Sequence, residues 1–235
     1  QAAGWEIASH ALKWIEYRDY DRAAEAAEMD EAIRLHTAIT GAAPRGWYTG
    51  RCTLHTVDLA AERGLAYVAD SYADDLPYWH PTPKGPQLIV PYTLDANDMR
   101  FATAQGFNSG DQFYAYLRDS FDVLYAEGKA GAPKMMSIGL HCRLAGRPGR
   151  AAALERFFAH ARAHPGVWFA RRIDIAEHWA ATHPAPAGPA AWQLDRAAFV
   201  AAYGAIYEHA PWIAERAYDA GLGPAQSTPD GLAAA

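Results

Sequence analysis

Short apolar segments alternate along this chain with longer segments whose apolar residues recur at helical spacing. Each short segment is rich in aliphatic or aromatic residues and is bounded by turn residues, as buried strands are. The pattern predicts six strands, at residues 5–8, 46–49, 66–69, 87–92, 135–140 and 167–170. Alternation of strands with helices indicates parallel strands joined by crossover helices.

The longer segments predict the helices. Residues 20–40 have helical periodicity, and Gly41 stands where a C-terminal cap belongs. Further helices are expected to begin near Thr56, Ser109, Arg150 and Asp174.

We therefore expect an α/β fold, in the form of a parallel barrel. Six strands are fewer than the roughly seven or eight that close such a barrel. We expect the first strand or two to lie upstream of Gln1, which makes the barrel N-terminally incomplete here. An open doubly wound sheet is the competing architecture. Because no glycine-rich phosphate loop opens a helix, a nucleotide-binding version of that sheet is not expected.

A proline-rich segment, HPAPAGPA at residues 183–190, separates this region from the rest of the chain. We expect one domain at 1–183, a linker at 184–193 and a short helical segment at 194–235. That segment is predicted to form two helices broken at Pro211, followed by a loosely ordered tail from Gly221. The inward-facing residues of its first helix are predicted to be Leu194, Phe199, Ile206 and Tyr207.

Composition limits the partners. Hydrophobic residues make up 51% of the chain, its formal charge is -6, and no basic cluster stands out. Nucleic acid and anionic membranes are therefore not expected as partners. No segment reaches the roughly 18 apolar residues that a membrane span needs. Cys52 and Cys142 fit no thiolate metal motif, and we expect reduced thiols in a cytoplasmic protein.

Candidate catalytic residues are the polar ones that follow strands, because the active site of a parallel barrel lies at the carboxyl ends of its strands. His141 ends the strand predicted at 135–140 and precedes a polar loop. Its imidazole can exchange a proton near neutral pH, which suits general acid–base catalysis. A surface or capping histidine is the alternative, and position alone favours neither.

His10 follows the strand predicted at 5–8, and Trp14 comes four residues later. On a helical turn the two residues would share a face, where a pair of histidines could hold zinc. The indole of Trp14 has no lone pair to give a metal, so zinc at His10 would need ligands from elsewhere. Trp14 is then either a core aromatic residue or one wall of a substrate pocket.

Three further residues are candidates for binding a small molecule. Arg45 directly precedes the strand at 46–49. Asp74 lies with a second aspartate in a loop, where a solvated or helix-capping carboxylate is the alternative. Asn97 follows the strand at 87–92 and can hydrogen-bond an amide or ureido group in both directions, with an Asx turn as the alternative.

Six segments carry a family resemblance, namely GWEIASHALKW, PRGWYTGR, DSYADDLPYW, VPYTLDANDMRF, FNSGDQFYAYLRDSFDVLY and MMSIGLHCRLAGRPGR. They resemble the bacterial allantoinases built on the polysaccharide-deacetylase (NodB-homology) fold. The resemblance covers about residues 1–183. It implies a deformed parallel α/β barrel and hydrolytic opening of the hydantoin ring of allantoin to allantoate, a step of urate and purine catabolism.

The resemblance also implies roles for single residues. In sugar deacetylases of this fold, an Asp-Asp motif supplies the base and a metal ligand, a His-x-x-x-His motif supplies two ligands, and a late histidine supplies the acid. His10 matches the first metal-motif histidine, Trp14 replaces the second, and His141 matches the late histidine. The allantoinase branch resembles this metal-deficient pattern, so no cofactor is expected. The Asp-Asp motif, and with it the general base, should lie upstream of Gln1.

The segment LDRAAFVAAYGAIYEHAPWIAERA, from Leu194, resembles the opening helices of 2-oxo-4-hydroxy-4-carboxy-5-ureidoimidazoline (OHCU) decarboxylase. That enzyme produces allantoin, so the resemblance implies a fusion of two consecutive steps. Its catalytic residues are expected beyond Ala235.

Together these observations predict a hydrolase that acts on a C–N bond of a cyclic amide. His141 would protonate the leaving nitrogen, and His10 would help to hold the oxyanion. Substrate binding would fall to Trp14, Asn97, Arg45 and Asp74. The alternatives are a metal-dependent deacetylase of polysaccharides or N-acetyl sugars with zinc at His10, a cyclic imidase, and an inactive fragment. A small-molecule substrate and a homo-oligomer are expected.

Overall fold

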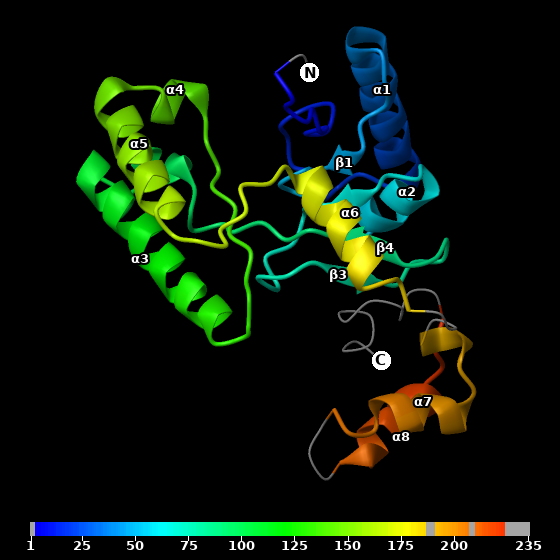
Figure 1. Cartoon of the computed structure of the whole chain (residues 1–235). Coiled ribbons are helices and arrows are strands. Elements are labelled where there is room, and N and C mark those ends of the chain that lie inside the picture. The colour runs from blue at the N-terminus through cyan, green and yellow to red at the C-terminus, as the bar shows by residue number, and fades with distance from the viewer. Residues whose placement is uncertain (1–2, 187–190, 207–209, 224–235) are drawn as a thin grey trace. The chain divides into compact units, whose positions relative to one another are not determined.

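The structure is a computed structural model that describes residues 3–186, 191–206 and 210–223. The chain divides into two compact units (Figure 1). Unit 1 comprises Gln1–Val68, Tyr78–Ile89 and Arg172–Ala235, and unit 2 comprises Ala69–Pro77 and Val90–Arg171. These boundaries differ from the division expected at residues 183 and 194, which rests on the proline-rich segment and on family resemblance and stays a prediction.

Unit 1 contains a four-stranded sheet of short strands in the order β1-β2-β4-β3. Strands β1 (Gly46–Trp47), β2 (Tyr67–Val68) and β4 (Gln87–Ile89) are parallel neighbours, and β3 (Tyr78–His80) pairs antiparallel with β4. The three parallel strands were expected at 46–49, 66–69 and 87–92 and are confirmed in shorter form. An α/β fold with parallel strands is therefore confirmed for this unit.

The other expected strands are not formed. Residues 5–8, 135–140 and 167–170 have no strand, although single parallel bridges join Ser9 to Trp47 and Asn97 to Gly139. An apolar segment forms a β-strand only where a neighbouring strand hydrogen-bonds to it along its length. Trp5 and Trp168, in two of these segments, are 75% and 57% exposed. Strand β3 was missed because it directly follows a proline and lies antiparallel at the sheet edge.

Helices α1 (Arg22–Thr40) and α2 (Thr56–Glu62) pack on the sheet of unit 1. Asp21 caps α1 by accepting a hydrogen bond from the Ala24 N–H at 2.8 Å, and Gly41 ends it with φ 82°, as expected. The core consists of Met29, Ala32, Trp47, Leu59, Ala60, Leu65, Val68 and Ile89. Ile39 is 83% exposed, because the last turn of α1 extends beyond the core that faces the sheet.

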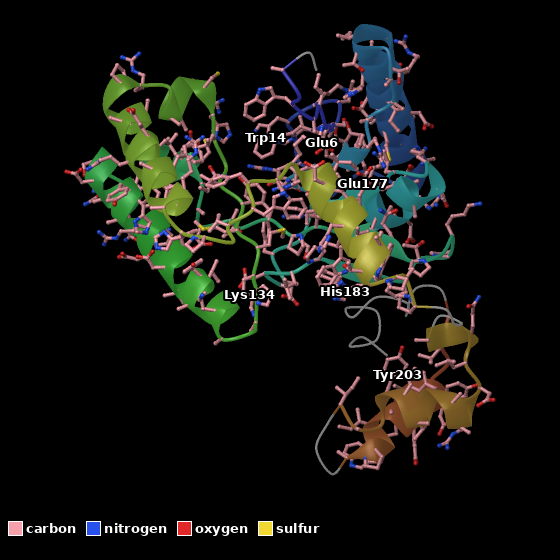
Figure 2. All side chains as sticks on the ribbon, viewed as in Figure 1. Glu6, Trp14, Lys134, Glu177, His183 and Tyr203 are labelled. Atoms are coloured by element: carbon pink, nitrogen blue, oxygen red, sulfur yellow. The ribbon has the colours of Figure 1, made fainter. Side chains whose placement is uncertain are left out.

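Two glutamates join distant segments of unit 1. Glu25, buried on α1, accepts hydrogen bonds from the hydroxyls of Thr53 and Thr56. Thr56 therefore ties α2 to α1, whereas His55 occupies the N-cap position expected for Thr56. Glu6 accepts from the Tyr67 hydroxyl at 2.8 Å and from the N–H of Ile173, in the first turn of α6 (Arg172–Thr182), at 2.9 Å (Figure 2).

The C-terminal helices of unit 1 are α7 (Arg196–Tyr203) and α8 (Pro211–Asp219), which follow the short 3-10 helix Ala191–Gln193. The predicted break at Pro211 is confirmed. Phe199 is buried as expected, but Ile206 is 66% exposed because α7 ends at Tyr203, so the helical face does not extend that far. The predictions for Tyr207 and for most of the tail, residues 224–235, lie outside the described residues.

Unit 2 is built around two packed helices, α3 (Gly110–Lys129) and α5 (Pro148–Arg162), with the 3-10 helix η1 (Asp98–Ala102) and the short helix α4 (Cys142–Ala145) beside them. Ser109 caps α3 as predicted, accepting from the Gln112 N–H at 3.3 Å. The cluster between the helices buries Phe113, Leu117 and Phe157.

Among the described residues, no helix is long and apolar enough to cross a membrane. Cys52 and Cys142 are both exposed, and neither is in a disulfide.

Removal of the Phe113 side chain tests the α3–α5 core. Phe113 is fully buried, so Phe113→Ala should lower the free energy of unfolding by about 3–5 kcal/mol through lost burial and a residual cavity. Val123 lies on the same helix and is 59% exposed, and Val123→Ala should change that free energy by less than about 0.5 kcal/mol. Urea denaturation of both variants measures the difference, and equal effects would contradict this packing.

Candidate active site

The predicted site residues fall into two sets. His10, Trp14 and Arg45 belong to unit 1, while Asp74, Asn97 and His141 belong to unit 2. The geometry of each set is described within its own unit.

His141 is held by a buried carboxylate. Its Nδ1 lies 2.6 Å from Asp98 Oδ1, and its backbone N–H donates to Asp98 Oδ2 at 2.7 Å. Asp98 is completely buried, whereas the His141 side chain is 31% exposed. The imidazole is therefore fixed at one nitrogen and accessible from solvent.

The Asp98 carboxylate has a third donor, the backbone N–H of Ala145 at 3.0 Å. Asp98 lies at the start of η1, and its own N–H donates to the Gly139 carbonyl at 3.0 Å. An unpaired buried carboxylate would cost several kcal/mol, so these donors are needed for the loop to hold its shape. Asp98 thus joins the segment after β4 to the segment that carries His141.

The carboxylate sets which nitrogen of His141 carries the proton. A carboxylate can only accept here, so Nδ1 is the donor and Nε2 is the nitrogen left for chemistry. Neutral His141 can then take a proton at Nε2, and the imidazolium can return it to a leaving group. This is the arrangement of a general acid–base histidine with an orienting aspartate.

Asn97 lies next to this pair. Its side-chain oxygen accepts from the Met99 N–H at 2.8 Å as the N-cap of η1, and its Nδ2 donates to the Tyr92 hydroxyl at 2.7 Å. A Cβ at position 139 would collide with Tyr92 and Asn97, so this close approach requires Gly139. Asn97 has one N–H and one acceptor position beyond these bonds, and its role in substrate binding stays a prediction.

Asp74 forms a turn. Its Oδ1 accepts from the N–H groups of Asp75 and Leu76, at 2.7 and 3.1 Å, and the residue is exposed. This is the geometry of the loop alternative considered from sequence. Its role in substrate binding stays a prediction.

In unit 1, His10 is part of an aromatic group. The parallel bridge between Ser9 and Trp47 brings His10 next to Tyr48, with ring centroids 4.9 Å apart. Ala11 has φ 57°, and this left-handed residue turns the chain directly after His10. The turn lets Trp14 pack edge-on against His10, at 5.2 Å between centroids, although residues 10–14 form no helix.

Trp14 is not a core residue, since it is 62% exposed (Figure 2). The guanidinium of Arg51 lies 5.3 Å from its ring centroid, within cation–π distance. The indole also rests on Gly50, where φ is 77° and a Cβ would come within 2.7 Å of the ring. Of the two readings from sequence, the exposed aromatic wall agrees with this geometry and the buried core residue does not.

Among the described residues, those around His10 do not supply a set of ligands that fits zinc. Among the described residues, His10 is in no group of three or more His, Cys, Asp or Glu side chains close enough to share an ion. The contact partners of its ring are Trp14 and Tyr48, and an indole offers a metal no lone pair. This donor set does not fit the zinc that the sugar deacetylases of the fold imply, and no step is derived through one.

Arg45 precedes β1, and its side chain pairs with Glu177 of α6 at 2.5 Å (Figure 2). Both side chains are more than half exposed, so the pair contributes less than about 1 kcal/mol. Arg45 lies at the amino end of its strand, and the predicted active-site edge is formed by carboxyl ends. Its role in substrate binding stays a prediction.

Sequence reasoning left three residues of these groups without a role. Asp98 is a polar residue after the segment at 87–92, and its complete burial cannot be seen in the sequence pattern. Tyr48 directly follows β1, as His10 directly follows Ser9, and Arg51 lies further along the same loop. Because residues after neighbouring parallel strands meet at one edge, the pairing of residues 9 and 47 was the signal that could have identified them.

Comparison with known proteins gives relatives of this chain. A scan of family models gives no match. A protein of Schizosaccharomyces pombe named "Putative polysaccharide deacetylase" is 44% identical over 201 residues, 78% of this chain and 63% of its own length.

Solved structures give the same result. The crystal structure of Puue allantoinase is 60% identical to this chain, with a TM-score of 0.76, over 79% of this chain and 62% of that one. A "probable Polysaccharide deacetylase" from Pseudomonas aeruginosa PAO1 is 58% identical, with a TM-score of 0.75 and the same coverage. A third structure, from Mycobacterium smegmatis, is 26% identical, with a TM-score of 0.70.

The chain has the α/β fold of the polysaccharide deacetylases, as expected from its resemblance to them. In sequence and fold the chain is similar to proteins named polysaccharide deacetylases, and one of its structural relatives is an allantoinase. The chain spans about three fifths of the length of the first relatives it matches.

The orientation of His141 can be measured directly. Nitrogen-15 NMR of the ring should find neutral His141 protonated at Nδ1, because Asp98 accepts that proton. Asp98→Asn should remove this preference and destabilise the fold by about 1–3 kcal/mol, since one buried N–H loses its acceptor. A wild-type His141 protonated at Nε2 would contradict the assignment.

Proposed function

We propose that this protein is a hydrolase that opens the hydantoin ring of allantoin to give allantoate. Two observations support the proposal: the His141–Asp98 pair in unit 2 and the 60% identity to an allantoinase structure. The pair carries the argument, because it provides an accessible proton-transfer group whose orientation is fixed by a buried charge.

The reaction needs a proton at a defined point. Water adds to a ring carbonyl, the C–N bond of the tetrahedral intermediate breaks, and the leaving nitrogen must be protonated. His141 first takes a proton from the attacking water at Nε2 and then returns it to the leaving nitrogen, while Asp98 positions the ring and stabilises the imidazolium. A carboxylate and a neutral ureido nitrogen are the products.

His10 and Trp14, which belong to unit 1, keep as proposals the substrate-binding roles that the family resemblance implies for them. Protonated or N–H-bearing His10 donates a hydrogen bond to the developing oxyanion. Trp14 offers an exposed aromatic face to the flat ring of the substrate, and Asn97 bonds the ureido group through its remaining donor and acceptor positions. Imide-like ring carbonyls are activated, so the step proceeds here without a metal to polarise them.

Deacetylation of an N-acetyl sugar polymer is the second candidate. It is favoured by the names of relatives from Schizosaccharomyces pombe and Pseudomonas aeruginosa. An unactivated acetamide gains more from a metal that polarises the carbonyl. The lack of a fitting donor set at His10 among the described residues therefore ranks ring opening above deacetylation.

Activity of the full chain on allantoin and on chitooligosaccharides tests the proposal. We expect allantoin hydrolysis that persists after chelation, and His141→Gln should lower kcat by about 10²–10⁴-fold. Asp98→Asn should lower kcat and change its pH profile, because the tautomer of His141 changes. His36 lies on α1 outside both residue sets, and His36→Gln should leave the rate unchanged.

Deacetylation without ring opening, or activity lost on chelation and restored by zinc, would favour the deacetylase. A folded chain inactive on both substrates would overturn both candidates in favour of the inactive fragment considered from sequence.

Substitution of Trp14 tests whether this residue contributes to substrate binding and not to the chemical step. Trp14→Ala should raise KM for allantoin about tenfold with little change in kcat, because a stacking face worth about 1–1.5 kcal/mol is lost. Trp14→Phe should retain part of the effect. Trp212 is a matched control, since it is also exposed and also lies under an arginine, at 5.8 Å. If Trp212→Ala raises KM equally, Trp14 has no specific role.

A further inference from the structure

Unit 2 contains a second group of titratable side chains, at the C-terminal end of α5. Asp122 projects from α3, His160 lies in the last turn of α5, and His164 follows two residues after that helix ends. One potential ligand atom from each residue lies within 4.8 Å of the others. Among the residues that the structure describes, no other group of three or more His, Cys, Asp or Glu side chains is close enough to share an ion.

The two histidines share one face of the helical turn. They are four residues apart, and their ring centroids are 4.7 Å apart. The adjacent helices α3 and α5 lie side by side and bring Asp122 to this face (Figure 1). His160 Nε2 is 2.6 Å from Asp122 Oδ1, so an imidazole nitrogen and a carboxylate oxygen already converge.

The protonation state of His164 is set by the backbone. Its Nδ1 lies 2.9 Å from the His160 carbonyl oxygen, and a carbonyl can only accept, so Nδ1 carries the proton. The lone pair of neutral His164 is therefore on Nε2. Histidine ligands of metals are commonly oriented in this way, by donating the other ring N–H to a carbonyl or carboxylate.

Aromatic packing restricts both imidazoles. Phe121 packs edge-on against His160 and His164, at 5.6 and 5.1 Å between ring centroids. Tyr125 packs against His164 at 4.8 Å, and its hydroxyl donates to the Pro165 carbonyl at 3.0 Å. The group is still open to solvent, since the side chains of His160 and Asp122 are 24% and 44% exposed. An ion can enter without unfolding the helices.

We propose that Asp122, His160 and His164 form a binding site for a divalent transition-metal ion of the zinc class, which links α3 to α5. Two imidazoles and one carboxylate suit zinc, nickel, copper or cobalt and do not suit magnesium or calcium, which prefer oxygen ligands. Three protein ligands leave a position for water. The ion replaces the proton shared by His160 and Asp122.

This site is separate from the His141–Asp98 pair. His141 precedes α4 and the N-terminal end of α5, whereas His160 and His164 lie at the other end of α5. The proposal therefore does not depend on the proposed function.

The alternative is a plain ion pair between Asp122 and protonated His160, which needs no third residue. His164 distinguishes the two, because it contributes to metal binding and not to the pair.

Titration of the metal-free full chain with zinc chloride, followed by calorimetry, tests the proposal. We expect binding near one equivalent, a rise in the thermal midpoint that EDTA reverses, and a shift of the Nε2 nitrogen-15 resonances of His160 and His164. Cobalt in place of zinc should give the visible absorption of a low-coordinate site. His164→Gln and Asp122→Asn should each weaken binding at least tenfold.

Two controls separate this site from others. His36→Gln should bind zinc as the wild type does. His10→Gln should also bind zinc as the wild type does. If His10→Gln is the only variant that abolishes zinc binding, the ion belongs at His10 and the proposal is overturned. It is equally overturned if zinc raises the midpoint of His164→Gln as much as that of the wild type, or if the wild type binds none. These measurements need no enzyme activity, so they stand whether or not the chain hydrolyses allantoin.

Discussion

The Asp98 carboxylate is the constraint on which the candidate active site in unit 2 depends. It is completely inaccessible to water, and it accepts hydrogen bonds from the His141 ring, the His141 backbone and the Ala145 backbone. Loss of any donor leaves a buried charge under-satisfied, so the loop after Gly139 and the start of α4 are held in one conformation. The exposed nitrogen of His141 is a consequence of this arrangement, since the carboxylate occupies the other one.

The same rule of parallel pairing operates in both units, each time through a single bridge. Ser9 pairs with Trp47, so the next residues along, His10 and Tyr48, come together. Asn97 pairs with Gly139, which brings Asp98 to the chain that carries His141. Parallel neighbours present their following residues at a common edge, and one bridged residue is enough to set that register. Neither site needs the long strands that hydrophobicity predicted.

Sequence reasoning recovered what local chemistry decides. The caps at Gly41 and Ser109 and the break at Pro211 are confirmed, because each depends on neighbouring residues. Three parallel strands are also confirmed, because those apolar segments pair with one another. It failed where contacts between distant segments decide. Trp5 lies in a segment predicted to form a buried strand but is exposed, and nothing in the sequence pattern shows that Asp98 is buried. Burial of a charge cannot be seen in periodicity, since it depends on donors some 40 residues away.

A four-residue spacing does not by itself define a pair of metal ligands. A histidine at position 14 would complete a His-x-x-x-His motif with His10, but residues 10–14 are not helical and the ring at position 14 is an indole. The spacing itself occurs at His160 and His164, at the end of a helix, where it does place two imidazoles on one face. A four-residue interval defines a ligand pair only when the backbone turns once between them and a third donor, here Asp122, reaches the same face.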